Sequence, residues 1–170
     1  MKNYQFPQDW PLPPEYLTEV GRISVLFGSL ESTVNVAISK LTGYDEVLDW
    51  RSAIVTAHAN FKQRIDILET LLHELHDEFP HLAGYRQVVN KIKQVQKKRN
   101  RFMHQALSMD PETGAVATSA LSARGKLKPE VKEVSLAELR SASADIHVAM
   151  IGLHNLLTQA ESKPIWDKAN

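Results

Sequence analysis

The strongest constraint on the fold is a run of apolar residues at helical spacing near the start of the chain. Between residues 17 and 41 they recur every third or fourth position: Leu17, Val20, Ile23, Phe27, Leu30, Val34, Ile38 and Leu41. A single stripe of this kind is typical of a helix that buries one face. We therefore expect a long first helix that begins at Pro14, a favoured first-turn residue, and ends near Gly43.

Similar spacing predicts further helices along the chain. A second helix is expected at about residues 45–58 and a third at about 60–79, and these two could be one helix with a bend. Pro80 ends the third helix, and another follows at about 81–105. Ser135, three residues before Glu138, predicts a capping box at the start of the last helix.

Residues 106–134 have a different character from the helical segments. They contain two turn sequences, at residues 110–114 and 124–126, flanked by Thr, Val and Ser. This pattern predicts a small antiparallel hairpin or meander, with a loop as the alternative. The fold class expected is an all-α, up-and-down helical bundle of four to five helices, with a small β-hairpin insertion before the last helix.

The domain organisation follows from length and from the position of the prolines. A chain of 170 residues predicts one domain, which we place at residues 14–162. Residues 1–13 are rich in proline and aromatic residues and are expected to form an extended arm, in which Trp10 either packs onto the body or docks onto a partner chain.

Composition excludes several kinds of chemistry. The chain has no cysteine, so it has no thiolate nucleophile and no Cys-ligated metal or cluster. His73 and His76 are three residues apart rather than four, which misses the usual helical metal pair, and we expect neither a metal nor another cofactor. No apolar run is long enough to span a membrane, and the N-terminal residues do not resemble a signal peptide, so we expect a cytoplasmic protein.

Charge is concentrated in one segment although the formal net charge is zero. Residues 91–109 hold six basic residues and no acidic one. On a helix with about 100° per residue, the basic side chains point to the side where solvent is expected. They are candidates for contacts with RNA phosphates, and a plain solvated helix face is the alternative. The candidates are Lys93, Lys97, Lys98 and Arg101.

Arg99 does not follow this pattern, because the same helical wheel places it within the apolar stripe of the helix. An arginine that faces the core needs a partner, since an unpaired buried charge is strongly unfavourable. Glu31, beside the apolar stripe of the first helix, is the best candidate. Asn100 and His104 are four residues apart and fall together at the edge of the stripe. A buried Arg–Glu pair with an unrelated surface histidine is the alternative interpretation.

These residues resemble a known family. The stretch Arg99–His104, RNRFMH, is similar to the R-x4–6-H motif of HEPN domains, which are small α-helical bundles with the motif late on a long helix. Residues 27–35, FGSLESTVN, resemble the first-helix pattern of small bacterial HEPN-like proteins. Residues 61–72, FKQRIDILETLL, resemble the second-helix pattern. The likeness covers most of residues 15–160.

The resemblance implies a metal-independent endoribonuclease, often a toxin of a toxin–antitoxin system or a phage-defence effector. It implies that Arg99 holds the scissile phosphate, that His104 is the general base or acid for attack by the 2′-hydroxyl, and that Asn100 orients one of them. It also implies a homodimer whose two motifs face one cleft, and a cognate antitoxin or inhibitor protein. Gly21 and Gly28 on the first helix would permit a second helix to approach closely.

Two other functions stay open on the sequence alone. The chain could be a catalytically silent HEPN-like interaction module in which Arg99 is structural. It could also be a helical bundle that binds a nucleotide or another ligand.

Overall fold

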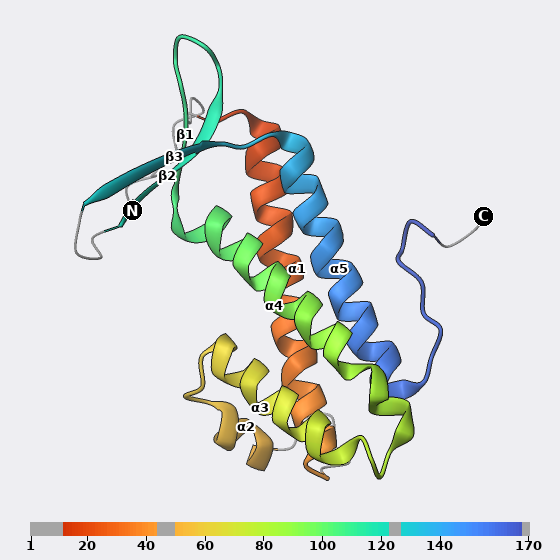
Figure 1. Ribbon diagram of the computed structural model, residues 1–170. Coiled ribbons are helices and arrows are strands. Elements are labelled where there is room, and N and C mark those ends of the chain that lie inside the picture. The colour runs from red at the N-terminus through yellow and green to blue at the C-terminus, as the bar shows by residue number, and fades with distance from the viewer. Residues whose placement is uncertain (1–11, 44–49, 123–126, 168–170) are drawn as a thin grey trace, which may run out of the picture.

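The computed structural model describes residues 12–43, 50–122 and 127–167. Within these ranges the chain is predominantly helical, as predicted (Figure 1). The helices are α1 (Pro14–Leu41), α2 (Trp50–Thr56), α3 (Phe61–Leu75), a 3₁₀ helix η1 (Pro80–Gly84), α4 (Tyr85–His104) and α5 (Leu136–Thr158). The interpretation of the arm at residues 1–13, including Trp10, falls almost entirely outside the described residues.

Local sequence signals explain where several helices begin and end. Pro14 occupies the first turn of α1. Asn60 caps α3 through a reciprocal pair of hydrogen bonds with Gln63, which makes α2 and α3 separate helices. Ser135 caps α5 by accepting a hydrogen bond from the Glu138 amide at 3.1 Å, which is one half of the predicted capping box.

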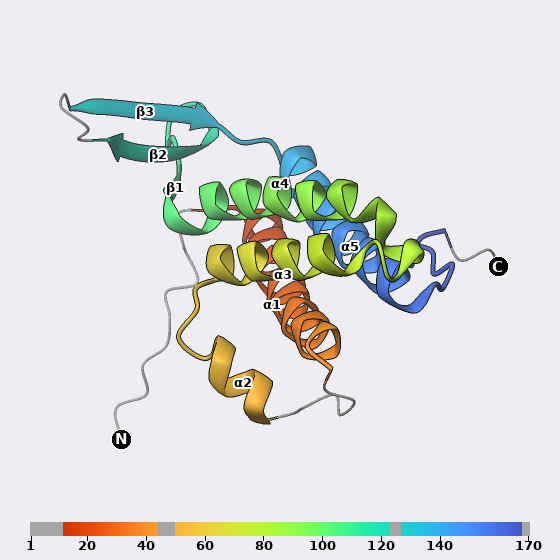
Figure 2. The ribbon, with the colours of Figure 1, turned by 60° about the horizontal axis from the view of Figure 1, so that its bottom comes forward.

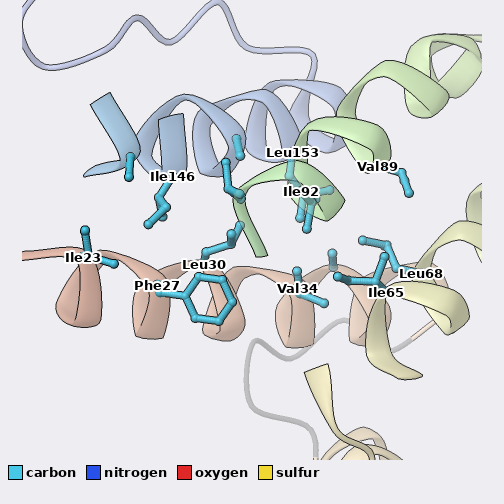
Figure 3. Close-up of a cluster of buried hydrophobic side chains, with 14 of the residues drawn as sticks. Ile23, Phe27, Leu30, Val34, Ile65, Leu68, Val89, Ile92, Ile146 and Leu153 are labelled. Carbon is cyan, nitrogen blue, oxygen red and sulfur yellow. The ribbon is translucent and has the colours of Figure 1, made fainter. Parts of the chain in front are cut away.

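Helix α1 lies at the centre of the molecule and contacts all four of the other α-helices. Its apolar stripe supplies side chains that face α3, α4 and α5, and Figure 3 shows this layer. The fully buried positions include Leu30 and Val34 of α1, Ile65 and Leu68 of α3, Val89 and Ile92 of α4, and Ile146 and Leu153 of α5. This core fixes α4 against both α3 and α5.

The insertion before α5 is a three-stranded antiparallel sheet, which is the meander that the turn sequences allowed and one strand larger than the hairpin of the expected fold class. Its strands, β1 (Ala106–Met109), β2 (Val116–Ser122) and β3 (Lys128–Glu133), lie in the order β1-β2-β3. Figure 2 shows the sheet extending beyond the helical body from the end of α4. The sheet therefore begins two residues after His104.

The β1–β2 turn follows the predicted turn chemistry. Asp110 accepts hydrogen bonds from the backbone amides of Thr113 and Glu112, and these bonds hold the pKa of its carboxyl below the usual range. Gly114 has φ +70°, a left-handed conformation that glycine adopts without strain.

The close approach of a second helix at Gly21 and Gly28 is not found within a single chain. A Cβ atom added at Gly21 or Gly28 would have no atom within 4 Å, so no helix of the same chain approaches closely there. Separately, none of the helices in the described ranges combines the length and apolar character needed to cross a membrane.

Candidate functional site

Arg99, Asn100 and His104 come together at the C-terminal end of α4. Nη1 of Arg99 donates a hydrogen bond to Oδ1 of Asn100 at 3.2 Å. The same nitrogen lies 2.7 Å from Nε2 of His104. Asn100 and His104 are exposed, while Arg99 is half-buried. The three residues of the predicted motif therefore form one cluster around a single guanidinium nitrogen.

The contact with Arg99 involves the Nε2 atom of the His104 ring. A guanidinium has only hydrogen-bond donors, so Nε2 of His104 must be the acceptor in this pair. Nε2 is consequently the basic atom of the cluster, and it is the atom nearest to the arginine.

The predicted ion pair between Arg99 and Glu31 is not formed. The guanidinium carbon of Arg99 lies instead 4.8 Å from the centre of the Phe27 ring, on α1. An aromatic face attracts a cation through a cation–π interaction, which needs no hydrogen-bond acceptor. A half-buried arginine is therefore stable there without a carboxylate. Among the described residues Arg99 has no carboxylate partner, and its buried Nε atom makes no hydrogen bond.

A second aromatic residue packs against Phe27 and supports its contact with Arg99. The ring of Phe61, at the start of α3, meets Phe27 edge-on with 4.8 Å between ring centres. Arg99 is thus held by aromatic contacts that join α4, α1 and α3. Sequence reasoning missed the role of Phe27, because its place in the apolar stripe of α1 looks the same as that of any core residue.

The basic strip on α4 is largely neutralised by carboxylates of neighbouring helices. Lys93 forms an ion pair with Glu69 of α3, and Lys98 forms one with Asp145 of α5. Lys91 also pairs with Asp145. The wheel predicted a free solvent face, but α4 lies between α3 and α5, and lysines on both of its flanks reach across to them.

Arg101 is also engaged within the chain. Its guanidinium donates hydrogen bonds to the carboxylate of Glu138, near the start of α5, and to the backbone oxygen of Glu133 at the end of β3. It lies 5.2 Å from the centre of the Phe102 ring. Arg101 thereby links α4 to the sheet and to α5. Of the four predicted RNA contacts, Lys97 alone has no carboxylate partner in the described part of the chain.

Asp145 is the acidic residue on which two of these lysines converge. Burial by itself would raise the pKa of its carboxyl, but the hydrogen bonds from Lys91 and Lys98 outweigh burial and hold that pKa below the usual range. Asp145 therefore stays ionised near neutral pH and fixes α5 against α4. Nothing local in the sequence marks it, since both partners lie at least 47 residues away.

The described residues contain no group of three or more histidine, aspartate or glutamate side chains arranged to hold a metal ion. In comparisons with known proteins, no family model, no curated protein and no solved structure matches this chain.

Proposed function

We propose that this protein is a metal-independent endoribonuclease of the HEPN type, in which Arg99, Asn100 and His104 carry the reaction. The observation that carries the proposal is the contact between Nη1 of Arg99 and Nε2 of His104. An arginine without a carboxylate partner retains its full positive charge for an anionic ligand. Nε2 of His104 lies directly beside this arginine, where it can act on the same ligand once the ligand replaces it as the acceptor.

The proposed reaction begins when an RNA phosphate takes the place of His104 as the acceptor for Arg99. Nε2 of His104 is then free to remove the proton from the neighbouring 2′-hydroxyl. The 2′-oxygen forms a bond to phosphorus, and the bond from phosphorus to the 5′-oxygen breaks. The leaving 5′-oxygen takes a proton from solvent, and the products are a 2′,3′-cyclic phosphate and a 5′-hydroxyl end.

Arg99 and Asn100 have distinct roles in this proposal. The guanidinium stabilises the charge that develops on the non-bridging oxygens of the phosphate. Asn100 accepts from the same Nη1 atom and so fixes the direction in which the guanidinium points. The further expectations from the family resemblance, a homodimer with both motifs in one cleft, a cognate antitoxin and a cytoplasmic location, belong to this proposal.

A catalytically silent interaction module is the second candidate, and one observation favours it. Three of the four basic residues expected to bind RNA are paired with carboxylates of the same chain. A neutralised strip attracts a polyanion weakly, because bound phosphates must compete with the internal partners. A nuclease of this architecture would depend mainly on Arg99 and Lys97 to hold its substrate.

The test is cleavage of single-stranded RNA in the presence of EDTA by wild type and by His104→Ala. We expect wild type to release fragments with 2′,3′-cyclic phosphate ends and to leave DNA intact, since DNA lacks the 2′-hydroxyl. The His104→Ala variant should lose about 100-fold or more of the rate, as expected for removal of a general base. His58→Ala, a change at another exposed histidine, is the matched control and should keep full activity.

Two outcomes would contradict the proposal. Equal activity of wild type and His104→Ala would identify a contaminating nuclease. Absence of cleavage by folded wild type at all RNA concentrations, with or without added divalent metal, would favour the interaction module instead.

A further inference from the structure

The outer edge of β3 presents backbone groups that no described strand pairs with. β3 is the last strand in the sheet order, so only its inner edge faces β2. The Val134 amide donates to the Val116 oxygen at 2.8 Å, which shows that the backbone of Val134 faces β2. Along an antiparallel strand the N–H and C=O groups of successive residues point alternately to one side of the strand and to the other. Val131 and Glu133 therefore direct these groups outward, away from β2.

This edge is exposed and has an apolar margin. All six residues of β3 are exposed, and Val131 has 74% of its surface accessible. Val131 pairs with Ser119, two residues from Leu121 on β2, so Val131 and Leu121 lie on the same face of the sheet. Leu121 is 68% accessible. An exposed strand edge with apolar side chains beside it is a template for another strand.

The sequence of β3, KPEVKE, is complementary to itself in one antiparallel register. With Val131 opposite its own copy, Glu130 lies opposite Lys132 of the partner subunit, and the reverse pair forms by symmetry. Opposite charges in such cross-strand positions are stabilising by roughly 0.2–1 kcal/mol per pair.

The neighbouring registers are unfavourable. A slip by one position would oppose an outward-facing residue to an inward-facing one, so only slips by two keep the backbone hydrogen bonds. A slip by two in one direction puts Glu130 opposite Glu130 of the partner subunit. A slip by two in the other direction puts Lys132 opposite Lys132 of the partner subunit. Like charges directly opposite each other are destabilising.

We infer that β3 of one chain pairs antiparallel with β3 of a second copy of this chain, with Val131 on the two-fold axis, to form one continuous six-stranded sheet. Each Val131 donates to the partner's Val131 oxygen, and each Glu133 donates to the partner's Pro129 oxygen. Pro129 has no N–H group, and its position in this register needs only its carbonyl. The apolar margin of Val131 and Leu121 becomes continuous across the axis.

This interface does not rest on the proposed nuclease function and is separate from a dimer formed through α1 or α4. The test is sedimentation velocity of the full chain over a micromolar to millimolar concentration series. Val131→Pro removes the outward N–H group without removing a hydrogen bond to β2, and we expect it to weaken self-association at least tenfold. Circular dichroism and the melting temperature verify that the variant is folded.

A charge swap supplies the matched control. Lys132→Glu places two acidic residues opposite each other and should weaken association several-fold. Combining it with Glu130→Lys exchanges the two charges and restores opposite-charge pairs, so the double variant should associate as wild type does. Association that is weakened in the single variant but not restored in the double variant would overturn the proposed register.

Two further measurements separate this interface from others. The Val131 and Glu133 amides should gain hydrogen-exchange protection as the protein concentration rises. Protection that does not depend on concentration, or a wild type that stays monomeric throughout the series, would overturn the proposal. Val25, which is 72% accessible on α1, gives a competing variant. Association lost in Val25→Ser but kept in Val131→Pro would assign dimerisation to α1 and would likewise overturn it.

Discussion

The guanidinium of Arg99 is stacked on the ring of Phe27, with 4.8 Å between the guanidinium carbon and the ring centre. This contact joins α4, which carries the motif, to α1, the central helix of the bundle. It also leaves the Nη1 atom of Arg99 directed toward Asn100 and His104. The cation is therefore held by an aromatic face, and its charge is not neutralised by a carboxylate within the described residues.

This arrangement changes the expected cost of removing the arginine. If Arg99 paired with a buried glutamate, Arg99→Ala would leave an unpaired charge and cost several kcal/mol. Since the partner is an aromatic ring, we expect Arg99→Ala to lower the free energy of unfolding by only about 1 kcal/mol. Urea unfolding at neutral pH measures this difference. A loss of several kcal/mol would mean that a charged partner exists after all.

Phe27 is expected to act on activity as a positioning residue for Arg99. Phe27→Leu should lower the free energy of unfolding by about 1.5 kcal/mol, because the side chain is buried and the substitution leaves it apolar. It also removes the surface that orients the guanidinium. We expect kcat for RNA cleavage to fall about tenfold, a loss of roughly 1.4 kcal/mol in transition-state stabilisation, while KM changes little.

Phe102→Leu is the matched control for this prediction. Phe102 is also buried and also lies beside an arginine, Arg101, but that arginine serves the junction between α4 and the sheet. It should lose similar stability and keep its kcat. Phe27→Tyr, which retains the aromatic face, should keep kcat near that of wild type. Equal loss of kcat in Phe27→Leu and Phe102→Leu would show a general structural effect instead.

The helices were predictable because their signals are local. The spacing of apolar residues in α1 and the Ser135 cap place those elements within a few residues of where they lie. The chain after Pro80 was less predictable, since η1 takes up Pro80–Gly84 before α4 begins at Tyr85. Two turn sequences in residues 106–134 are compatible with a hairpin and with a meander, and the three-stranded sheet is the meander.

The candidate site was predictable only in part, and for a physical reason. The residues of the motif lie within one and a half turns of α4, so a helical wheel brings them together. Their other partners come from distant segments: Phe27 lies on α1, and the carboxylates that neutralise the lysines lie on α3 and α5. A wheel contains one helix and therefore cannot show which of its flanks meet a neighbour.

The ion pairs of Asp145 predict a pH dependence of stability. The folded-state pKa of this carboxyl lies below its unfolded value of about 3.9, so folding favours the ionised form. Its contribution is complete above the unfolded pKa and is lost as the pH falls through the folded pKa. We expect Asp145→Asn to cost about 1 kcal/mol at pH 7 and to flatten the decline of stability between about pH 4 and 2.

Asp66→Asn is the control for this prediction, because Asp66 is exposed and forms no ion pair in the described structure. It should leave both the stability at pH 7 and its acid decline unchanged. Asp110 also has a lowered pKa and contributes to the acid decline in every variant. The difference between wild type and Asp145→Asn therefore isolates the contribution of Asp145. A decline identical in both would contradict the assignment.

The ion pairs of the basic residues on α4 lead to a prediction for RNA binding. For single-stranded RNA, each phosphate contact adds about 0.7 to the slope of log affinity against log salt concentration. Lys97 has no carboxylate partner in the described structure, whereas Lys93 is held by Glu69. We therefore expect Lys97→Ala to reduce the slope by about 0.7 and Lys93→Ala to change it little. Glu69→Gln, which frees Lys93, should increase the slope and the affinity.

These slopes are best measured by fluorescence anisotropy with each change made in the His104→Ala protein, which is expected to bind RNA without cleaving it. Equal effects of Lys97→Ala and Lys93→Ala would show that the ion pair to Glu69 opens when RNA binds, and a slope near zero for all proteins would exclude nucleic acid as the ligand.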